Sequence, residues 1–239
     1  MVYTGVTDGY PVHPVINRRD GWDFVCFAES DMSCAGWTVV PIAANEIVMD
    51  NEFIANDKSK TTKRIKILPH LHLPGYDVSI WIDSSLQFKR HVDLDGLSAD
   101  FERSPAVLRV RAHPYRRCIY REAEEIVKCN LDTQQSVDRV VAKYREEGFP
   151  ENFGLAESNY VLRKHNADSM IAFSEAWWHQ VQNLSRRDQL SFNYVLWKNP
   201  IAVEFIDDRI RPEIEVLSRG RDRGAFFNAT FNFFPTRGR

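Results

Sequence analysis

The chain has 239 residues, 44% hydrophobic and 27% charged, so it can bury a sizeable core as one large domain or two small ones. Its formal net charge of −2 argues against nucleic-acid binding driven by the charge of the whole molecule. No apolar run is long enough to span a membrane, the N-terminus lacks a signal-peptide pattern, and the four cysteines lack C-x-x-C spacing. These features predict a cytoplasmic protein with reduced thiols.

Three short strands are predicted at the start of the chain, over residues 2–7, 24–27 and 37–40, with Pro41 ending the third. A helix follows over residues 57–68 and ends before Pro69. Its run of cations is typical of a solvated helix face. Because the run lies just before the next strand, Arg64 and Lys66 are also candidates to face a ligand.

The next strand ends at a carboxylate. Val78 to Ile82 form an unbroken apolar run, which is typical of a strand buried on both faces in a mostly parallel sheet. The run stops at Asp83, and Ser84 and Ser85 follow. Asp83 either caps the turn or lies where open α/β sheets bind their ligands, and this segment alone favours neither interpretation.

Two histidines precede that strand. His70 and His72 have an i, i+2 spacing that occurs in metal sites when the segment is extended, whereas histidines of a surface loop would show the same spacing. Together with His113 and Asp83 they define an alternative function, a metal-dependent hydrolase of an amide or ester.

A basic connection joins the following strand, residues 106–111, to a helix over residues 118–128. It contains His113, Arg116 and Arg117. A helix N-terminus attracts anions, and arginine binds phosphate or carboxylate through two parallel hydrogen bonds. A solvated basic loop is the competing interpretation, but the coincidence of strand end, arginines and helix start favours an anion site.

Further helices are predicted over residues 132–147, with Asp132 as the cap, and over residues 166–182. A strand over residues 159–162 lies between them, and Glu157 precedes it. A last strand is predicted over residues 202–206. We expect residues 1–206 to form the domain and residues 207–239, which are charged and then Phe-rich, to pack on it as an extension.

The helix predicted over residues 185–198 is apolar almost all round, so it should be buried. Ser185 is its predicted cap, and polar residues, Arg186 to Gln189, cluster in its first turn. Such clustering indicates that this end opens into a cleft, or that Ser185 caps the helix and an Arg–Asp ion pair forms there.

Seven short segments, taken together and in this order, resemble a known family. They are residues 3–7, 65–70, 81–85, 113–122, 147–150, 154–155 and 186–192. They resemble the glycosyltransferase-like domain of plant mucilage-synthesis and turgor-regulation proteins and of many bacterial proteins. The resemblance covers roughly residues 2–200. It implies an α/β fold, a single GT-A-like (Rossmann-like) domain with a mixed, mostly parallel central sheet flanked by helices.

The resemblance also implies a function in polysaccharide biosynthesis. The enzyme would take a nucleotide-diphosphate sugar as donor and a glycan or a lipid-linked molecule as acceptor. In that family of folds, an Asp-x-Asp motif after a buried strand holds Mn²⁺ or Mg²⁺ and the diphosphate. Asp83 and Ser85 occupy the matching positions, which leaves Asp83 as the one strong metal ligand. A non-catalytic carbohydrate-binding protein is a further alternative.

The remaining site residues follow from the same resemblance. Thr4 and Asp8 would lie near the base or ribose, and Lys66 beside the diphosphate. Arg116 and Arg117 would neutralise part of its charge, and His113 and Arg187 would also belong to the donor site. Asp188 and Gln189 would lie beside the transferred sugar or the acceptor. Asp188 is the first candidate for a general base that deprotonates the acceptor hydroxyl, and Glu157 is the second.

Overall fold

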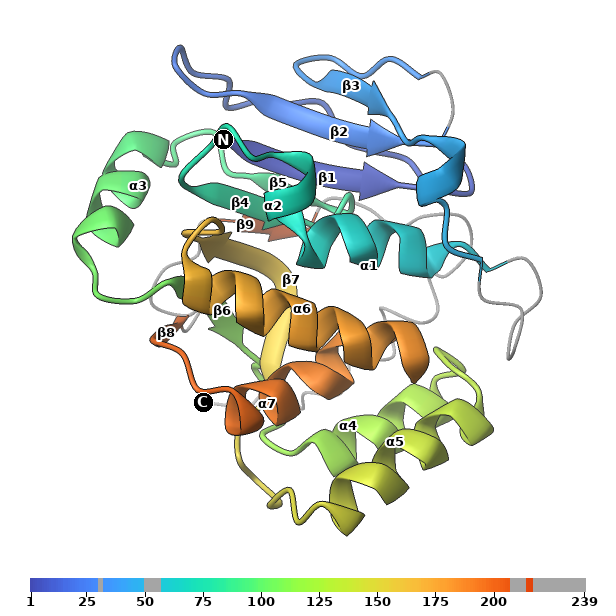
Figure 1. Cartoon of the computed structure of the whole chain (residues 1–239). Coiled ribbons are helices and arrows are strands. Elements are labelled where there is room, and N and C mark those ends of the chain that lie inside the picture. Colours follow the sequence, from blue (N-terminus) through green and yellow to red (C-terminus); the bar gives the residue numbers. More distant parts are fainter. Residues whose placement is uncertain (30–31, 50–56, 207–213, 217–239) are drawn as a thin grey trace, which may run out of the picture.

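The computed structural model describes residues 1–29, 32–49, 57–206 and 214–216. A seven-stranded sheet in the order β3-β2-β1-β4-β7-β6-β8 forms its middle layer (Figure 1). Strand β7 is antiparallel to both of its neighbours, and every other neighbouring pair is parallel, so the predicted mixed, mostly parallel sheet is confirmed. The strands are β1 (Val2–Val6), β2 (Phe24–Ala28), β3 (Thr38–Pro41), β4 (Ser79–Ile82), β6 (Leu108–Ala112), β7 (Ala156–Arg163) and β8 (Val203–Ile206).

Helices cover both faces of this sheet. Figure 1 shows α1 and α6 running across one face, with α7 packed beside α6, and α3 at the far end of the sheet. Helices α4 and α5 pack on each other beside α7. The helices are η1 (Ala44–Glu46, a 3-10 turn), α1 (Ser59–Ile67), α2 (Pro69–His72), α3 (Leu94–Arg103), α4 (Ile119–Lys128), α5 (Gln134–Glu146), α6 (Asp168–Asn183) and α7 (Asp188–Lys198).

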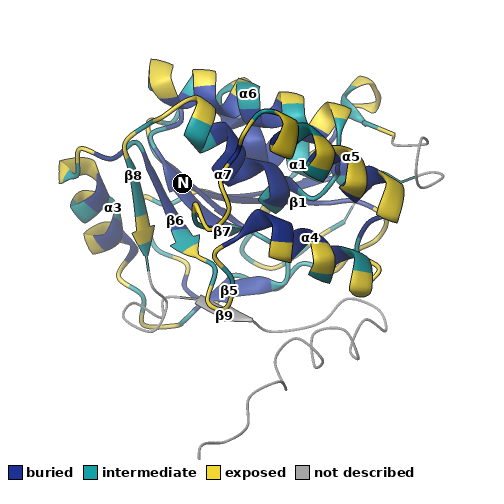
Figure 2. Ribbon diagram, turned by 90° about the horizontal axis from the view of Figure 1, so that it is seen from below, coloured by how far each residue is buried: buried dark blue, intermediate teal, exposed yellow. Residues whose placement is uncertain are grey.

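The core is divided by the sheet because side chains alternate along each strand. Tyr3 and Trp81 pack on the side of α1, α6 and α7. Ile80 and Ile82 point to the other side, where Phe101 of α3 covers them. Figure 2 shows buried strands between helices whose outer faces are exposed. Burial on both faces explains why β1 and β4 carry no charged residue.

Several boundaries differ from the predictions. Helix α1 ends before Pro69 as predicted, but Pro69 begins a further short helix, α2, because proline suits the first position of a helix. Helix α5 is capped by Thr133, which accepts a hydrogen bond from Ser136 N, and not by Asp132. Helix α7 begins only at Asp188, so Ser185 is not its cap. The α3 helix was not predicted.

Strand β7 is longer than predicted and irregular. It begins at Ala156 and therefore includes Glu157. Val110 of β6 pairs with Val161, but the next residue, Arg111, pairs with Glu157, so three residues of β7 have no partner in β6. A bulge of this kind bends a strand and redirects its side chains, and bulges are frequent next to active sites.

The described part of the C-terminal extension is one short strand. Strand β9 (Ile214–Val216) pairs antiparallel with β5 (Leu86–Phe88), which follows directly on Asp83 to Ser85. The Phe-rich segment lies outside the described residues, so the predicted division at residue 206 stays a prediction. No helix in the described ranges is both long enough and apolar enough to cross a bilayer.

Candidate functional site

The polar residues predicted for the site gather at one edge of the sheet. Strands β1, β4 and β6 are parallel and end at this edge, where Asp8, Asp83 and His113 follow them, and the antiparallel β7 starts there with Glu157. Backbone hydrogen bonds hold the segments together, from Asp83 N to Asn159 O (2.9 Å) and from His113 N to Leu155 O (2.8 Å). Open α/β sheets bind ligands at this edge.

Asp188 is the most strongly held carboxylate of the site. It is buried at the start of α7, and its Oδ2 lies 2.6 Å from Lys66 Nζ and accepts a hydrogen bond from the Ser158 hydroxyl (2.8 Å). Its Oδ1 lies 3.0 Å from Lys63 Nζ. Lys63 and Lys66 share one face of α1 because they are three residues apart. The side chains thus tie α1, β7 and α7 together.

These contacts decide what Asp188 can do chemically. Burial alone would raise the pKa of its carboxyl, but Lys63, Lys66 and Arg187 outweigh burial and hold that pKa far below the ordinary value. A carboxylate with so low a pKa is a poor proton acceptor at neutral pH. The geometry therefore favours a fixed negative charge over the predicted general base.

Asp83 is more accessible than Asp188. Its side chain is 35% exposed, and its Oδ1 accepts a hydrogen bond from the Trp81 indole N–H (2.7 Å) and lies 3.7 Å from Lys66 Nζ. Lys66 is thereby placed between the two aspartates, and its side chain is 1% exposed. Ser85 follows at the turn into β5. Lys66 and Asp83, which were both predicted to lie at the diphosphate, are thus neighbours, with Lys66 deep in the protein.

The pKa of Glu157 is shifted in the opposite direction to that of Asp188. Burial raises the pKa of its carboxyl above the ordinary value, and the charges of Asp83 and Glu122 add to the effect, while Arg111 opposes it. Arg111 Nη2 lies 3.4 Å from Glu157 Oε2, and Arg111 also donates a hydrogen bond to Asn159 (3.2 Å). A carboxyl group with a raised pKa is better suited to take and release a proton near neutral pH.

The basic connection before α4 is folded on itself. Nδ1 of His113 accepts hydrogen bonds from the backbone N–H groups of Tyr115 (3.2 Å) and Arg116 (2.9 Å). Burial and the nearby Arg116 lower the pKa of His113 to about 4, so the ring is neutral at pH 7. Arg116 Nε lies 2.5 Å from the carboxylate of the buried Glu122. Arg117 is exposed.

Four further residues were predicted to lie at the donor: Thr4, Asp8, Arg187 and Gln189. Thr4 is fully buried within β1, which disfavours a direct contact between its hydroxyl and a nucleotide. Asp8 is exposed just beyond the end of β1. Arg187 and Gln189 flank Asp188 and are partly exposed. The assignment of these residues to the donor stays a prediction.

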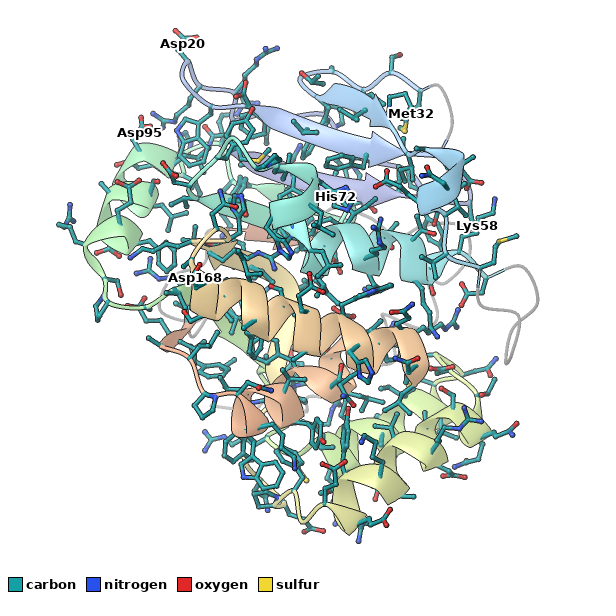
Figure 3. All side chains as sticks on the ribbon, viewed as in Figure 1. Asp20, Met32, Lys58, His72, Asp95 and Asp168 are labelled. Atoms are coloured by element: carbon teal, nitrogen blue, oxygen red, sulfur yellow. The ribbon has the colours of Figure 1, made fainter. Side chains whose placement is uncertain are left out.

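The three histidines of the hydrolase hypothesis do not converge. His70 and His72 lie in a helix, not in an extended segment, and face different acids (His72 is labelled in Figure 3). His70 Nε2 lies 3.0 Å from Glu175, and His72 Nδ1 lies 3.5 Å from Glu46. The described residues contain no group of three side chains able to hold a metal ion. The prediction of a hydrolase site at these histidines is therefore wrong.

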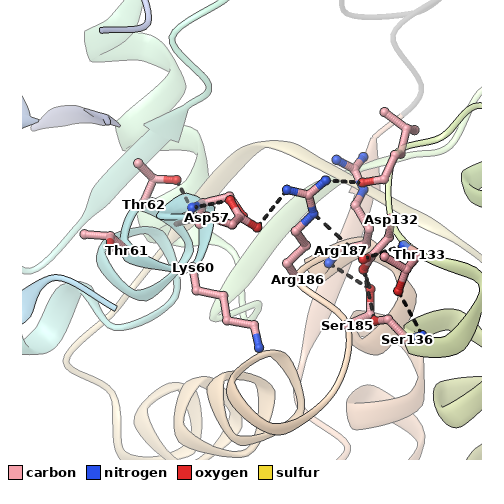
Figure 4. Close-up of polar contacts among 12 residues, drawn as sticks. Asp57, Lys60, Thr61, Thr62, Asp132, Thr133, Ser136, Ser185, Arg186 and Arg187 are labelled. Carbon is pink, nitrogen blue, oxygen red and sulfur yellow. Dashed lines mark hydrogen bonds and ion pairs between the residues drawn. The ribbon is translucent and has the colours of Figure 1, made fainter. Parts of the chain in front are cut away.

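A second layer of polar contacts fixes the segment that leads into α7 (Figure 4). Arg186 Nη1 lies 2.7 Å from Asp57, which precedes α1, and Arg186 Nη2 donates to Leu131 O (2.8 Å). The buried Asp132 accepts from the hydroxyl of Ser185 (2.6 Å). Asp132 and Ser185, both predicted as caps, instead join the α4–α5 connection to the start of α7.

Three members of the site were not predicted as site residues: Lys63, Ser158 and Arg111. Lys63 was visible as one cation among several, and the three-residue spacing from Lys66 was the available signal. Ser158 and Arg111 are brought in by the irregular pairing of β6 and β7, for which the sequence has no local signal.

The chain is similar to a known family of glycosyltransferase-like domains. The profile of a family described as "TOD1/MUCI70, glycosyltransferase-like domain" matches residues 34–215. A relative from Arabidopsis thaliana, named "Probable hexosyltransferase MUCI70", is 27% identical over 158 residues. The match covers 62% of this chain but 27% of that relative, so the chain spans about a quarter of the relative's length.

Solved glycosyltransferases share the fold. The galactosyltransferase LgtC, solved with donor and acceptor sugar analogues, is 10% identical with a TM-score of 0.51, covering 87% of this chain and 73% of its own. Core-mannan synthase A from Aspergillus fumigatus, in a Mn/GDP form, is 9% identical with a TM-score of 0.50, covering 86% and 72%. At such identities the likeness concerns the fold, and it confirms the expected GT-A-like architecture.

Proposed function

Because the chain belongs to the TOD1/MUCI70 glycosyltransferase-like domain family, we propose that it transfers a sugar from a nucleotide-diphosphate sugar to a hydroxyl group of a glycan or lipid-linked acceptor. The observation that carries this proposal is the gathering of Asp83, Glu157 and the Lys63–Asp188–Lys66 group at the carboxyl edge of the sheet. Such an edge offers both cations for a diphosphate and a carboxyl group for proton transfer.

Glu157 is the proposed proton acceptor. The bond between the sugar C1 and the diphosphate oxygen breaks, and its electron pair stays on the diphosphate. The acceptor oxygen forms the new bond to C1, and its proton passes to the Glu157 carboxylate. The raised pKa of Glu157 suits this role, whereas the low pKa of Asp188 suits a residue that keeps its charge and orients Lys63 and Lys66.

A divalent metal is the usual partner of the diphosphate in this fold, and a solved neighbour is described as a Mn/GDP form. The side chains present here do not fit an ion held by the chain itself. Asp83 is followed by Ser85 where a second acid would stand, and Oδ1 of Asp83 already faces Lys66 and the Trp81 N–H. Across the described residues, no cluster of three metal-ligating side chains exists. The transfer is therefore proposed to proceed without a metal ion held by the chain.

The test begins with binding. UDP, GDP and a panel of their sugar conjugates are added to the protein, with and without Mn²⁺, and the melting temperature is measured. A nucleotide that binds only the native state raises it, by an amount that grows with the ratio of ligand concentration to Kd. A panel with no effect under either condition contradicts the proposal.

Turnover is then measured as release of the nucleoside diphosphate from the donor that binds, because transfer to water requires no knowledge of the acceptor. Glu157→Gln is expected to keep donor binding and to lose release by about 100-fold or more. Donor binding by the wild-type protein without any release would favour the carbohydrate-binding alternative over a transferase.

A further inference from the structure

Three cations surround Asp188. Lys63 and Lys66 contact its two oxygens, and the positive charge of Arg187, the residue before it, makes a smaller contribution to lowering the pKa of Asp188. The only other carboxylate with a described ion pair to this group is Asp83, at Lys66. Positive charge therefore exceeds negative charge within the group.

The excess charge is on the side chains that a ligand can reach. The Lys63 side chain is 18% exposed, in contrast to the 1% of Lys66. Arg187 is partly exposed, and its buried Nε has no hydrogen-bond partner among the described residues. A buried donor without a partner costs free energy unless a ligand or water satisfies it. Lys63 and Arg187 are thus placed to bind an anion.

The protein holds these cations in place from several directions. Lys63 and Lys66 lie on one face of α1, and Arg187 belongs to the turn that Arg186 anchors to Asp57 and to the α4–α5 connection (Figure 4). The Ser185 hydroxyl also accepts a hydrogen bond from Arg187 N (3.0 Å). Fixed cations neutralise developing charge without reorganising during the reaction.

Lys66 also lies beside Asp83, which occupies the position of the first acid of the Asp-x-Asp motif. Its ammonium group lies between Asp83 and Asp188, so a divalent ion at Asp83 would meet a buried positive charge 3.7 Å from the ligand oxygen. Two positive charges beside the same carboxylate oxygen repel each other.

We propose that Lys63, Lys66 and Arg187 form a metal-independent binding site for the diphosphate of the donor, in the role that a divalent cation has in related folds. This inference rests on the proposed function. Lys63 and Arg187 contact the diphosphate oxygens. Lys66, whose side chain is buried, adds positive charge from within the protein. Arginine and lysine are the side chains that bind phosphate groups most strongly.

The experiment measures the Kd of UDP and of GDP for the full chain by calorimetry, once in EDTA and once in Mn²⁺. For the nucleotide that binds, we expect the two Kd values to agree within about threefold. Lys63→Gln and Arg187→Gln are each expected to weaken binding in EDTA about tenfold or more. Both positions are partly exposed, so the variants should fold, which their melting temperatures verify.

Lys58→Gln is the matched control. Lys58 also lies at the start of α1, but it pairs with Glu29 and not with Asp188, so its loss should leave the Kd unchanged. Binding that requires Mn²⁺ would overturn the metal-independent site and leave the transferase proposal standing. Wild-type affinity in Lys63→Gln and Arg187→Gln would also overturn it. Absence of nucleotide binding under both conditions would instead contradict the proposed function itself.

Discussion

At the scale of single residues, the fold separates the two carboxyl groups that the sequence proposed as bases. Asp188 is buried between ammonium groups, which lower its pKa, whereas Glu157 is partly buried with fewer compensating charges, and burial raises its pKa. Two groups of the same chemistry thereby differ in how readily they take up a proton, because their surroundings differ. The consequences for stability and for activity are separately measurable.

Asp188→Asn should strongly destabilise the protein. The substitution leaves the buried Lys66 with only the more distant Asp83 as a described ion-pair partner, and breaking a buried pair on one side costs about 3–5 kcal/mol. Urea unfolding measures the loss. Glu124→Gln, which removes the exposed Arg121–Glu124 pair, is the control and should change stability by less than about 0.5 kcal/mol. Equal effects of the two substitutions would contradict the buried role of Asp188.

The pH dependence of stability should reveal the same group. The folded-state pKa of Asp188 lies below the unfolded value of 3.8, so the stabilisation is complete above that value and is lost as the pH falls from 3.8 towards the folded pKa. Below pH 4, the wild-type protein should therefore lose stability more steeply than Asp188→Asn. Parallel curves from pH 5 to 2, measured by urea unfolding, would refute this assignment.

Glu157 predicts a signature in the pH profile of turnover. A base must be deprotonated to act, and the pKa of Glu157 lies above its ordinary 4.5, so kcat/KM for diphosphate release should rise with pH through a midpoint above 4.5. The residual activity of Glu157→Gln should lack that rise. A midpoint that persists in the variant would assign the titration to another group.

At the scale of elements, the strands that position the site were predictable and their irregularity was not. The uncharged, largely apolar sequences of β1, β2 and β4 predicted strands correctly because both faces are buried. The bulge in β7 depends on pairing with β6 across the sheet, a relation that no local pattern encodes. Asp83 and Glu157 could therefore be named as candidates, whereas Ser158 at the Asp188 carboxylate could not.

Gly154 at the entrance to β7 is a sensitive position. Its φ of +115° is unfavourable for other residues, and an added Cβ would lie 3.3 Å from Asn193 Nδ2. Asn193 Oδ1 accepts the hydrogen bond from Ala156 N that starts the strand (2.8 Å). Gly154→Ala should therefore destabilise the protein by more than Gly148→Ala, which has a positive φ but open space and should cost about 1–2 kcal/mol. Urea unfolding measures the free energy of unfolding of both variants. A larger loss of stability in Gly148→Ala than in Gly154→Ala would contradict this prediction.

At the scale of the whole molecule, parts of the chain that are distant in sequence come together around the turn that contains Asp83. The seven-stranded sheet uses strands from residues 2–206, and β9 then returns to pair with β5, directly after the Asp83 turn. The seven segments that resemble a family gave the architecture in advance, because the order of its motifs follows the order of its strands. The return of β9 was hidden because three residues in a charged stretch carry no strand pattern.

In a chain that ends at Ile206, the backbone amides of β5 should lose their protection from hydrogen exchange. Without β9, the backbone groups of Leu86 to Phe88 that pair with it are left without their partner strand. Hydrogen exchange at these amides should then be faster than in a chain that ends at Val216, which retains β9. Equal exchange in the two shortened chains would show that β9 contributes nothing to this part of the site.

The pairing of β5 with β9 also sets an order of events during synthesis. A ribosome releases the turn that contains Asp83 long before it releases the strand that will lie beside the following residues. Contacts between such distant segments form late, because the intervening chain must first be ordered. The edge of the sheet that gathers the charged side chains would then be the last part of the nascent protein to mature, after the helices and the parallel strands have already folded.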